Sequence, residues 1–142
     1  MAAVQLIQAH AELEERFSSA LGAIHGLSLK EAMLLLHVAQ AEGHRLSRID
    51  LAKRLSISPS SVTRLTAPME KRGLVGRESH PHDARYAYVV LTDAGRRAIT
   101  DASATLQRAS ERMFANLWSP AEIETLTRLL GRLSVSYPVV MT

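Results

Sequence analysis

The stretch SRIDLAKRLSISPSSVTRLTAPMEKRG, residues 47–73, decides the fold of this chain. Ser47 is suited to cap a helix over RIDLAKRL, and Ser58 is suited to cap a second helix that stops at Gly73. Only the short break SIS separates the two segments. Two short helices joined by such a turn are typical of a helix-turn-helix unit.

Pro68 lies inside the second of these helices. Proline in a helix interior removes one backbone hydrogen bond and usually costs about 3 kcal/mol. It lies to the side of the helix, away from the inward stripe of Val62, Leu65 and Met69. We therefore expect the helix to continue through Pro68 with a local bend.

The face opposite that stripe has the chemistry of a DNA-reading surface. It carries short, polar or basic residues, which are Ser60, Thr63, Arg64, Ala67 and Lys71. Arginine bonds bidentately to guanine in the major groove, and serine or threonine reaches bases or phosphates. An ordinary solvated helix face is the alternative interpretation.

Composition narrows the class of protein. The chain has 142 residues, 46% of them hydrophobic and 4% aromatic, which suits one domain with an aliphatic core. The absence of cysteine excludes disulfides and cysteine-ligated zinc. No apolar run approaches the roughly 20 residues of a membrane span, and the N-terminus does not resemble a secretion signal. We expect a cytoplasmic protein with no membrane partner.

The positive charge is concentrated in the middle of the chain. Residues 45–85 hold nine Lys/Arg and four Asp/Glu, whereas residues 1–44 hold two and five. A basic middle beside nearly neutral arms favours a polyanionic partner, with a merely solvated basic face as the alternative.

The remaining patterns predict a mainly α fold with a small β-hairpin. Helical spacing covers residues 4–24 and 29–42, and a long helix is expected from Thr92 to about Leu117, followed by a last helix after Ser119. LVGRES and RYAYVVLT are the two short strands. A hairpin directly after a recognition helix makes a winged helix-turn-helix.

The hairpin tip, HPHDAR, adds further candidate DNA contacts. Arg85 suits a narrow minor groove, and Asp83 is placed to orient its guanidinium. His80 and His82 with Asp83 can also be interpreted as metal ligands, but an exposed tip lacks supporting groups and we expect no metal. His37, inside the apolar second helix, is expected to be a core histidine rather than a ligand.

No catalytic motif is present, so the sequence predicts neither an enzyme nor a bound cofactor. There is no G-x-S-x-G, no H-E-x-x-H and no glycine-rich phosphate loop. The serines of residues 56–61 are better explained as helix caps and phosphate donors than as nucleophiles.

The chain resembles the multiple antibiotic resistance regulator (MarR) family of bacterial transcription factors. The resemblance is carried by VTRL at 62–65, EKRGLV at 70–75, Asp83-x-Arg85 and Leu91-Thr92-x-x-Gly95. It implies a homodimer, with a dimerisation helix over residues 1–27, a winged helix-turn-helix lobe over 28–92, and dimerisation helices over 93–142. Ser56 departs from the common turn glycine, and the lack of cysteine argues against the peroxide-sensing branch.

The resemblance also implies which residues meet double-stranded DNA. These are Ser47, Ser60, Ser61, Thr63, Arg64, Asp83 and Arg85, and the residues themselves add Lys71, Arg77 and His82 as further candidates. It implies a regulator, expected to be a repressor, of a pseudo-palindromic operator, released by a small aromatic or phenolic effector. Weak candidates for effector binding are His10, Arg16 and His37. The alternative function is a winged-helix protein-interaction module without specific DNA binding.

Overall fold

A computed structural model describes residues 1–83 and 86–134 of the chain. Its helices are α1 (Ala2–His25), α2 (Leu29–Gln40), the 3-10 turn η1 (Glu42–His44), α3 (Arg48–Leu55), α4 (Pro59–Lys71), α5 (Asp93–Phe114) and α6 (Pro120–Gly131). Its strands are β1 (Arg45–Ser47), β2 (Val75–Ser79) and β3 (Ala87–Leu91). The prediction of a mainly α, winged helix-turn-helix fold is confirmed.

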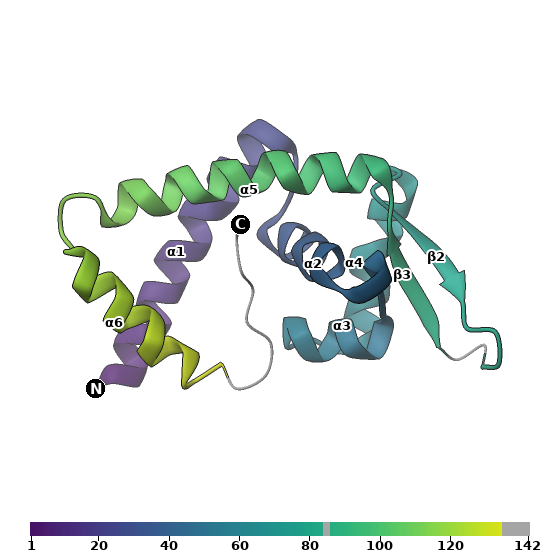
Figure 1. Cartoon of the computed structure of the whole chain (residues 1–142), viewed down its shortest axis with the longest axis horizontal. Coiled ribbons are helices and arrows are strands. Elements are labelled where there is room, and N and C mark those ends of the chain that lie inside the picture. The colour runs from purple at the N-terminus through teal and green to yellow at the C-terminus, as the bar shows by residue number, and fades with distance from the viewer. Residues whose placement is uncertain (84–85, 135–142) are drawn as a thin grey trace.

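The molecule has two parts joined by α5. Figure 1 shows α5 running along the top, with α1 and α6 at one end and the lobe of α2, α3, α4 and the strands at the other. α1 packs on α5, and there the His25 Nε2 and Thr105 Oγ1 atoms lie 2.7 Å apart. The division of the chain into dimerisation and DNA-binding segments stays a prediction.

The wing is a three-stranded antiparallel sheet rather than a simple hairpin. Its strand order is β1-β3-β2, with Leu46 opposite Val89 and Val75 opposite Leu91. The hairpin was predicted, but β1 was not. Three residues are too few to show alternation, and β1 forms only because β3, much later in the chain, offers it an edge.

The helix-turn-helix forms as the sequence indicates. Ser58 caps α4 through the Ser61 N–H, and Ser56 has the left-handed φ of 54° usually taken by glycine. α4 continues through Pro68, which confirms the predicted continuity, while the bend stays a prediction. Pro68 is exposed, and because proline has no N–H, the Arg64 carbonyl lacks its usual helical partner.

Two helix ends differ from the predicted positions. The second helix stops at Gln40, because Ala41 is extended and Gly43, with φ 65°, lies in the following 3-10 turn. α5 stops at Phe114 rather than near Leu117. Spacing alone does not mark either end, since Ala41 and Glu42 beyond the first and Ala115 and Leu117 beyond the second are all compatible with a helix.

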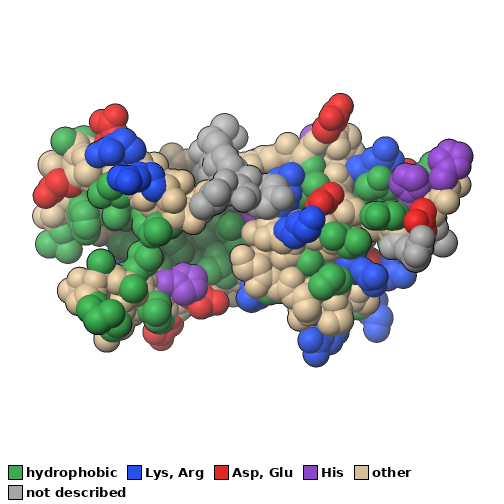
Figure 2. Space-filling view, turned by 90° about the horizontal axis from the view of Figure 1, so that it is seen from below, with side chains coloured by type: hydrophobic (Ala, Val, Ile, Leu, Met, Phe, Trp, Pro, Cys, Tyr) green, Lys and Arg blue, Asp and Glu red, His purple; other side chains and the backbone are tan. Residues whose placement is uncertain are grey.

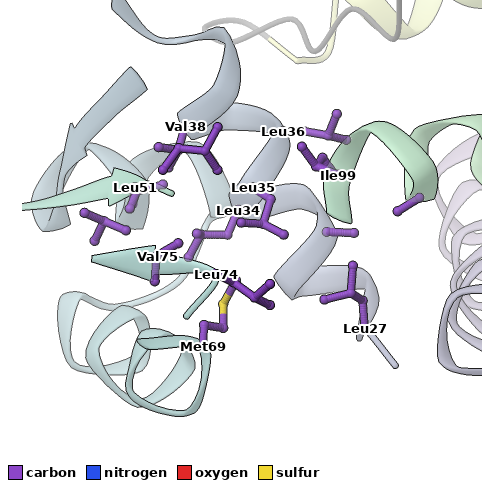
Figure 3. Close-up of a cluster of buried hydrophobic side chains, with 14 of the residues drawn as sticks. Leu27, Leu34, Leu35, Leu36, Val38, Leu51, Met69, Leu74, Val75 and Ile99 are labelled. Atoms are coloured by element: carbon purple, nitrogen blue, oxygen red, sulfur yellow. The ribbon is translucent and has the colours of Figure 1, made fainter. Parts of the chain in front are cut away.

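The core is built around α2. Leu34, Leu35 and Val38 are completely buried, and α2 contacts α1, α3, α4, α5 and the sheet. Figure 3 shows these side chains meeting Leu51, Met69 and Val75 from the surrounding elements. A helix that is apolar on most sides must be covered on most sides, as its sequence predicts.

No single helix within the described ranges has both the length and the hydropathy of a membrane span. α1 and α2 meet those criteria only as a pair, which is bent by 81°.

His37 lies in this core, in agreement with its interpretation as a core histidine. It is 3% exposed, and burial, with the nearby positive charge of Arg54, lowers its pKa below the usual 6.5. The unfolded chain therefore binds more protons than the folded chain just below pH 6.5. The His37 contribution to stability is fully present above that pH and is lost as the pH falls through the folded pKa.

We expect the free energy of unfolding to fall more steeply for the wild type than for His37→Leu between about pH 7.5 and about pH 5.5. Leucine keeps an apolar side chain in the core and cannot be protonated. Urea unfolding at the two pH values measures the difference. Parallel losses in the two proteins would contradict the assignment to His37.

Gly95 allows the first turn of α5 to pack closely against Leu74, the residue that precedes β2. A Cβ at this position would overlap the Leu74 carbonyl oxygen and approach Leu91 Cδ1 to 3.0 Å. Thr92, the α5 cap, holds the same junction: its Oγ1 donates to the Leu74 carbonyl at 2.9 Å and accepts the Gly95 N–H at 3.0 Å.

Gly95→Ala is expected to lower the free energy of unfolding by about 1–3 kcal/mol, because the methyl group has no space. Gly22→Ala is the matched control, since its helical Cβ meets nothing within 4 Å. Helix propensity predicts that this control gains up to about 1 kcal/mol. Denaturant unfolding of both variants checks the prediction, and equal effects would show that the close approach at Gly95 is unimportant.

Candidate nucleic-acid interface

Three serines form the exposed start of α4. The Ser58 Oγ accepts the Ser61 N–H at 3.1 Å, donates to the Ser61 Oγ at 2.9 Å, and lies 3.0 Å from the Ser60 Oγ. Pro59 has no N–H, and the Ser61 and Val62 N–H groups bond to Ser58, so the Ser60 N–H and the helix dipole are what favour an anion here. This end of α4 therefore offers hydroxyl and amide groups to a phosphate or a base edge.

Arg64 stands one turn further along, on the same side as Ser61. Its Nη2 donates to the Ser61 Oγ at 3.2 Å, and the residue is exposed. Within residues 1–83 and 86–134, no carboxylate lies within ion-pair distance of Arg64 or of the exposed Lys71. Both charges are therefore available to a polyanion.

The inner face of α4 anchors these groups. Val62 and Met69 are fully buried, and Thr66 is 3% exposed. Leu65 is only half-buried, at the edge of the predicted stripe. The buried face fixes the rotation of the helix, so the polar face points away from the core.

Two arginines of the wing form ion pairs with glutamates. Arg77 on β2 donates to the Glu70 Oε1 at 3.3 Å, which ties the wing to α4. Arg45 on β1 pairs with Glu78 at 2.8 Å and lies 4.8 Å from the centre of the Tyr88 ring. Arg77 was a predicted DNA contact, and the structure places it beside α4 with a carboxylate partner.

The tip of the wing is held by local bonds. The His80 Nδ1 accepts the His82 N–H at 3.1 Å, and the Asp83 carbonyl accepts the Tyr86 N–H at 3.0 Å. The His82 side chain is exposed. Arg85, the predicted minor-groove residue, lies outside the described residues.

Ser47 is the predicted contact with the least access. It is 7% exposed, and its Oγ accepts the Asp50 N–H at 3.0 Å as the cap of α3. The pairing of β1 with β3 places Ser47 opposite Tyr88 and covers it. A bond from Ser47 to a phosphate would therefore need local opening around this cap.

Basic side chains gather on the lobe that holds α3, α4 and the wing. Figure 2, viewed from below, shows this concentration on the right half, while the left half is hollowed and lined by hydrophobic side chains. Sequence reasoning missed two of the basic residues that shape this lobe, Arg45 and Arg48. Their partners, Glu78 and Thr63, lie 33 and 15 residues away, beyond the reach of helical or strand spacing.

The three weak candidates for effector binding lie in different places. His10 lines an apolar cavity between α1, α2 and α5 with a volume of about 300 Å³. Arg16 borders a separate open groove on α1, and His37 is in the core. The structure does not bring these residues into one site.

The metal alternative finds no support in the part of the chain that the structure describes. No cluster of three His, Asp or Glu side chains there is arranged to hold an ion. The rings of the two wing histidines instead contact each other, and the His80 ring also contacts Tyr86, in both cases at a centroid distance of about 6 Å.

Known proteins share this arrangement. Residues 25–85 match the family model described as MarR family. The chain is 33% identical over 108 residues to an uncharacterised HTH-type transcriptional regulator of Bacillus subtilis, YdgJ, covering 76% of this chain and 64% of that protein. It is 30% identical to the HTH-type transcriptional repressor Rv2887 of Mycobacterium tuberculosis, covering 90% of this chain and 89% of that protein.

Among solved structures, Sco3205 of Streptomyces coelicolor, a MarR family regulator crystallised with DNA, superimposes with a TM-score of 0.84 at 25% identity. The superposition covers 94% of this chain and 83% of that one. The predicted family and the absence of an enzymatic function are thereby confirmed. The chain belongs to the MarR family of DNA-binding transcriptional regulators.

Proposed function

We propose that the protein is a sequence-specific, dimeric repressor of a pseudo-palindromic operator. The observation that carries this proposal is the outward face of α4, where Arg64 and Lys71 are exposed and have no carboxylate partner among the described residues. A helix with such a face, followed by a wing, fits the major groove and the adjoining backbone. The DNA complex of Sco3205 and the repressor name of Rv2887 support the proposal.

Arg64→Ala is expected to lower affinity for the preferred operator by about 1–3 kcal/mol and to relax selectivity at one base pair per half-site. Fluorescence anisotropy on the preferred duplex and on single-base variants measures both effects. Arg97→Ala removes the same charge from an exposed position on α5 and serves as the control. An equal loss on every sequence would exclude a base-reading role for Arg64.

A protein-interaction module without specific DNA binding is the second candidate function. The partnered arginines favour it, since Arg45 and Arg77 are paired with carboxylates. The open polar face of α4 argues against it. Gel shifts on a specific and a scrambled duplex over a salt series separate the two, because non-specific binding is salt-dependent and shows no preference between them.

Dimerisation is supported by an uncovered apolar surface on α1 and α6. Ile7 is 68% exposed on α1, Leu129 is 43% exposed on α6, and Leu133 is 67% exposed just beyond it. No residue of α6 is buried within the chain, although the helix is amphipathic. Monomeric proteins rarely expose contiguous apolar surface of this kind, and a second copy would cover it. Two-fold symmetry then sets two copies of α4 about 34 Å apart, one turn of DNA.

The double variant Leu129→Glu/Leu133→Glu is expected to convert a dimer into monomers, because the interface would have to bury two carboxylates. Sedimentation equilibrium measures the mass against the 15.6 kDa of one chain. Tyr86→Glu places the same charge on an exposed apolar residue of the wing and should leave the dimer intact. A monomeric wild type would contradict the proposal.

Release by a small effector is supported by the cavity between α1 and α2. It is lined by His10, Leu13, Glu14, Phe17, Leu29, Met33, Leu36 and Leu106. The lining is apolar except at one side, where His10 and Glu14 lie 3.7 Å apart. An aromatic molecule with one polar group fits such a lining, which is the predicted effector class.

A further inference from the structure

Arg48 reaches from α3 to the recognition helix. It is the first residue of α3, and its Nη1 donates to the Thr63 Oγ1 at 3.2 Å. Both residues border a small hollow of about 70 Å³ between α4 and the wing, which Arg77 and Tyr88 also line. Arg48 therefore stands beside the face of α4 proposed to enter the groove.

The hydroxyl group of Thr63 is committed within the protein. Its Oγ1 donates to the Pro59 carbonyl at 3.2 Å and accepts the Arg48 N–H. A hydroxyl has one hydrogen and two lone pairs, so Thr63 has no donor left for a base. Its Oγ1 can still accept one further hydrogen bond, and neither of the two bonds involves its γ-methyl group.

The charge of Arg48 is not neutralised by the described residues. Arg45, Arg72 and Arg77 each have a carboxylate within 3.3 Å, whereas no described carboxylate lies within ion-pair distance of Arg48. A guanidinium has five N–H donors, and Thr63 takes one of them. The exposed Arg48 side chain thus keeps its charge and most of its donors.

We propose that Arg48 and Thr63 act as one DNA-reading element. Arg48 contacts a backbone phosphate at the edge of the groove that α4 occupies, since the helix preceding a recognition helix crosses the backbone. Thr63, with its hydroxyl held by Arg48 and Pro59, contacts a thymine methyl through its own methyl group. This inference rests on the proposed function, in which α4 enters the major groove.

Two substitutions, each removing one of the two groups on the Thr63 Cβ, test whether the methyl or the hydroxyl group reads the base. Thr63→Val keeps the γ-methyl and loses the hydroxyl, whereas Thr63→Ser keeps the hydroxyl and loses the methyl. Each protein is used to select sequences from a library of duplexes with a randomised core. We expect Thr63→Val to select the wild-type sequence, and Thr63→Ser to lose the preference for thymine at one position per half-site. The reverse result, with Ser retaining and Val losing the preference, overturns the proposal.

Arg48→Ala tests the phosphate contact. On the duplex selected by the wild type, and on a scrambled duplex, we expect a similar loss of affinity of roughly tenfold and a salt slope reduced by about one per subunit. Arg48→Lys should retain the salt slope. Lys53→Ala is the matched control, because it removes an exposed cation from the same helix. An unchanged salt slope in Arg48→Ala overturns the proposal.

The failure of this inference is distinguishable from failure of the proposed function. If the wild type selects no sequence, both are wrong. If it selects a sequence, but Arg48→Ala keeps the wild-type salt slope and Thr63→Ser keeps the wild-type preference for thymine, only the reading element is wrong. Thermal unfolding of each variant ensures that the compared proteins are folded.

Discussion

Burial of α2 on most of its circumference is the constraint on which the rest of the structure depends. Leu34, Leu35 and Val38 are inaccessible to solvent, so separate elements must cover separate sides of the helix. α3, α4, α5 and the sheet do so, and each presents its own apolar residues inward. The recognition helix, α4, is one of the elements that pack on α2. Its outward face does not contact the core and is the face proposed to bind DNA.

The far end of the recognition helix has a second attachment, at the junction of α1 and α2. Arg72 donates to the Gly26 carbonyl at 2.9 Å and to the Glu31 Oε2 at 3.3 Å. The same Glu31 oxygen accepts the Ser28 N–H that begins α2. Leu29, in that first turn, borders the apolar cavity. A ligand there can change DNA affinity only if it binds one arrangement of these helices better than another, and these bonds connect the two regions.

Local chemistry in the sequence predicted most of the fold and part of the site. Ser58 followed by proline marked the start of α4, whereas the left-handed conformation of Ser56, at the usual position of the turn glycine, emerged only from the structure. β1 escaped prediction because its pairing depends on β3, which local spacing does not encode. The contact of Arg48 with Thr63 escaped for the same reason, since it exists only once α3 and α4 have packed.

The charges counted in the sequence are not all equally available to DNA. Residues 45–85 carry nine basic side chains, but Arg45, Arg72 and Arg77 face carboxylates. These pairs are partly exposed, so each contributes at most about 1 kcal/mol, and a phosphate can compete for its arginine. When an arginine leaves its carboxylate for a phosphate, the unpaired carboxylate remains close to the DNA. Repulsion between that carboxylate and the phosphates offsets part of the binding free energy gained. Arg48 and Arg64 have no described carboxylate partner and bear no such cost; Arg64 lies on α4, and Arg48 on α3 bonds to Thr63 of α4. Charge density along the chain therefore indicates the lobe proposed to bind DNA, whereas the pairing of individual side chains favours Arg48 and Arg64 as the proposed contacts on that lobe.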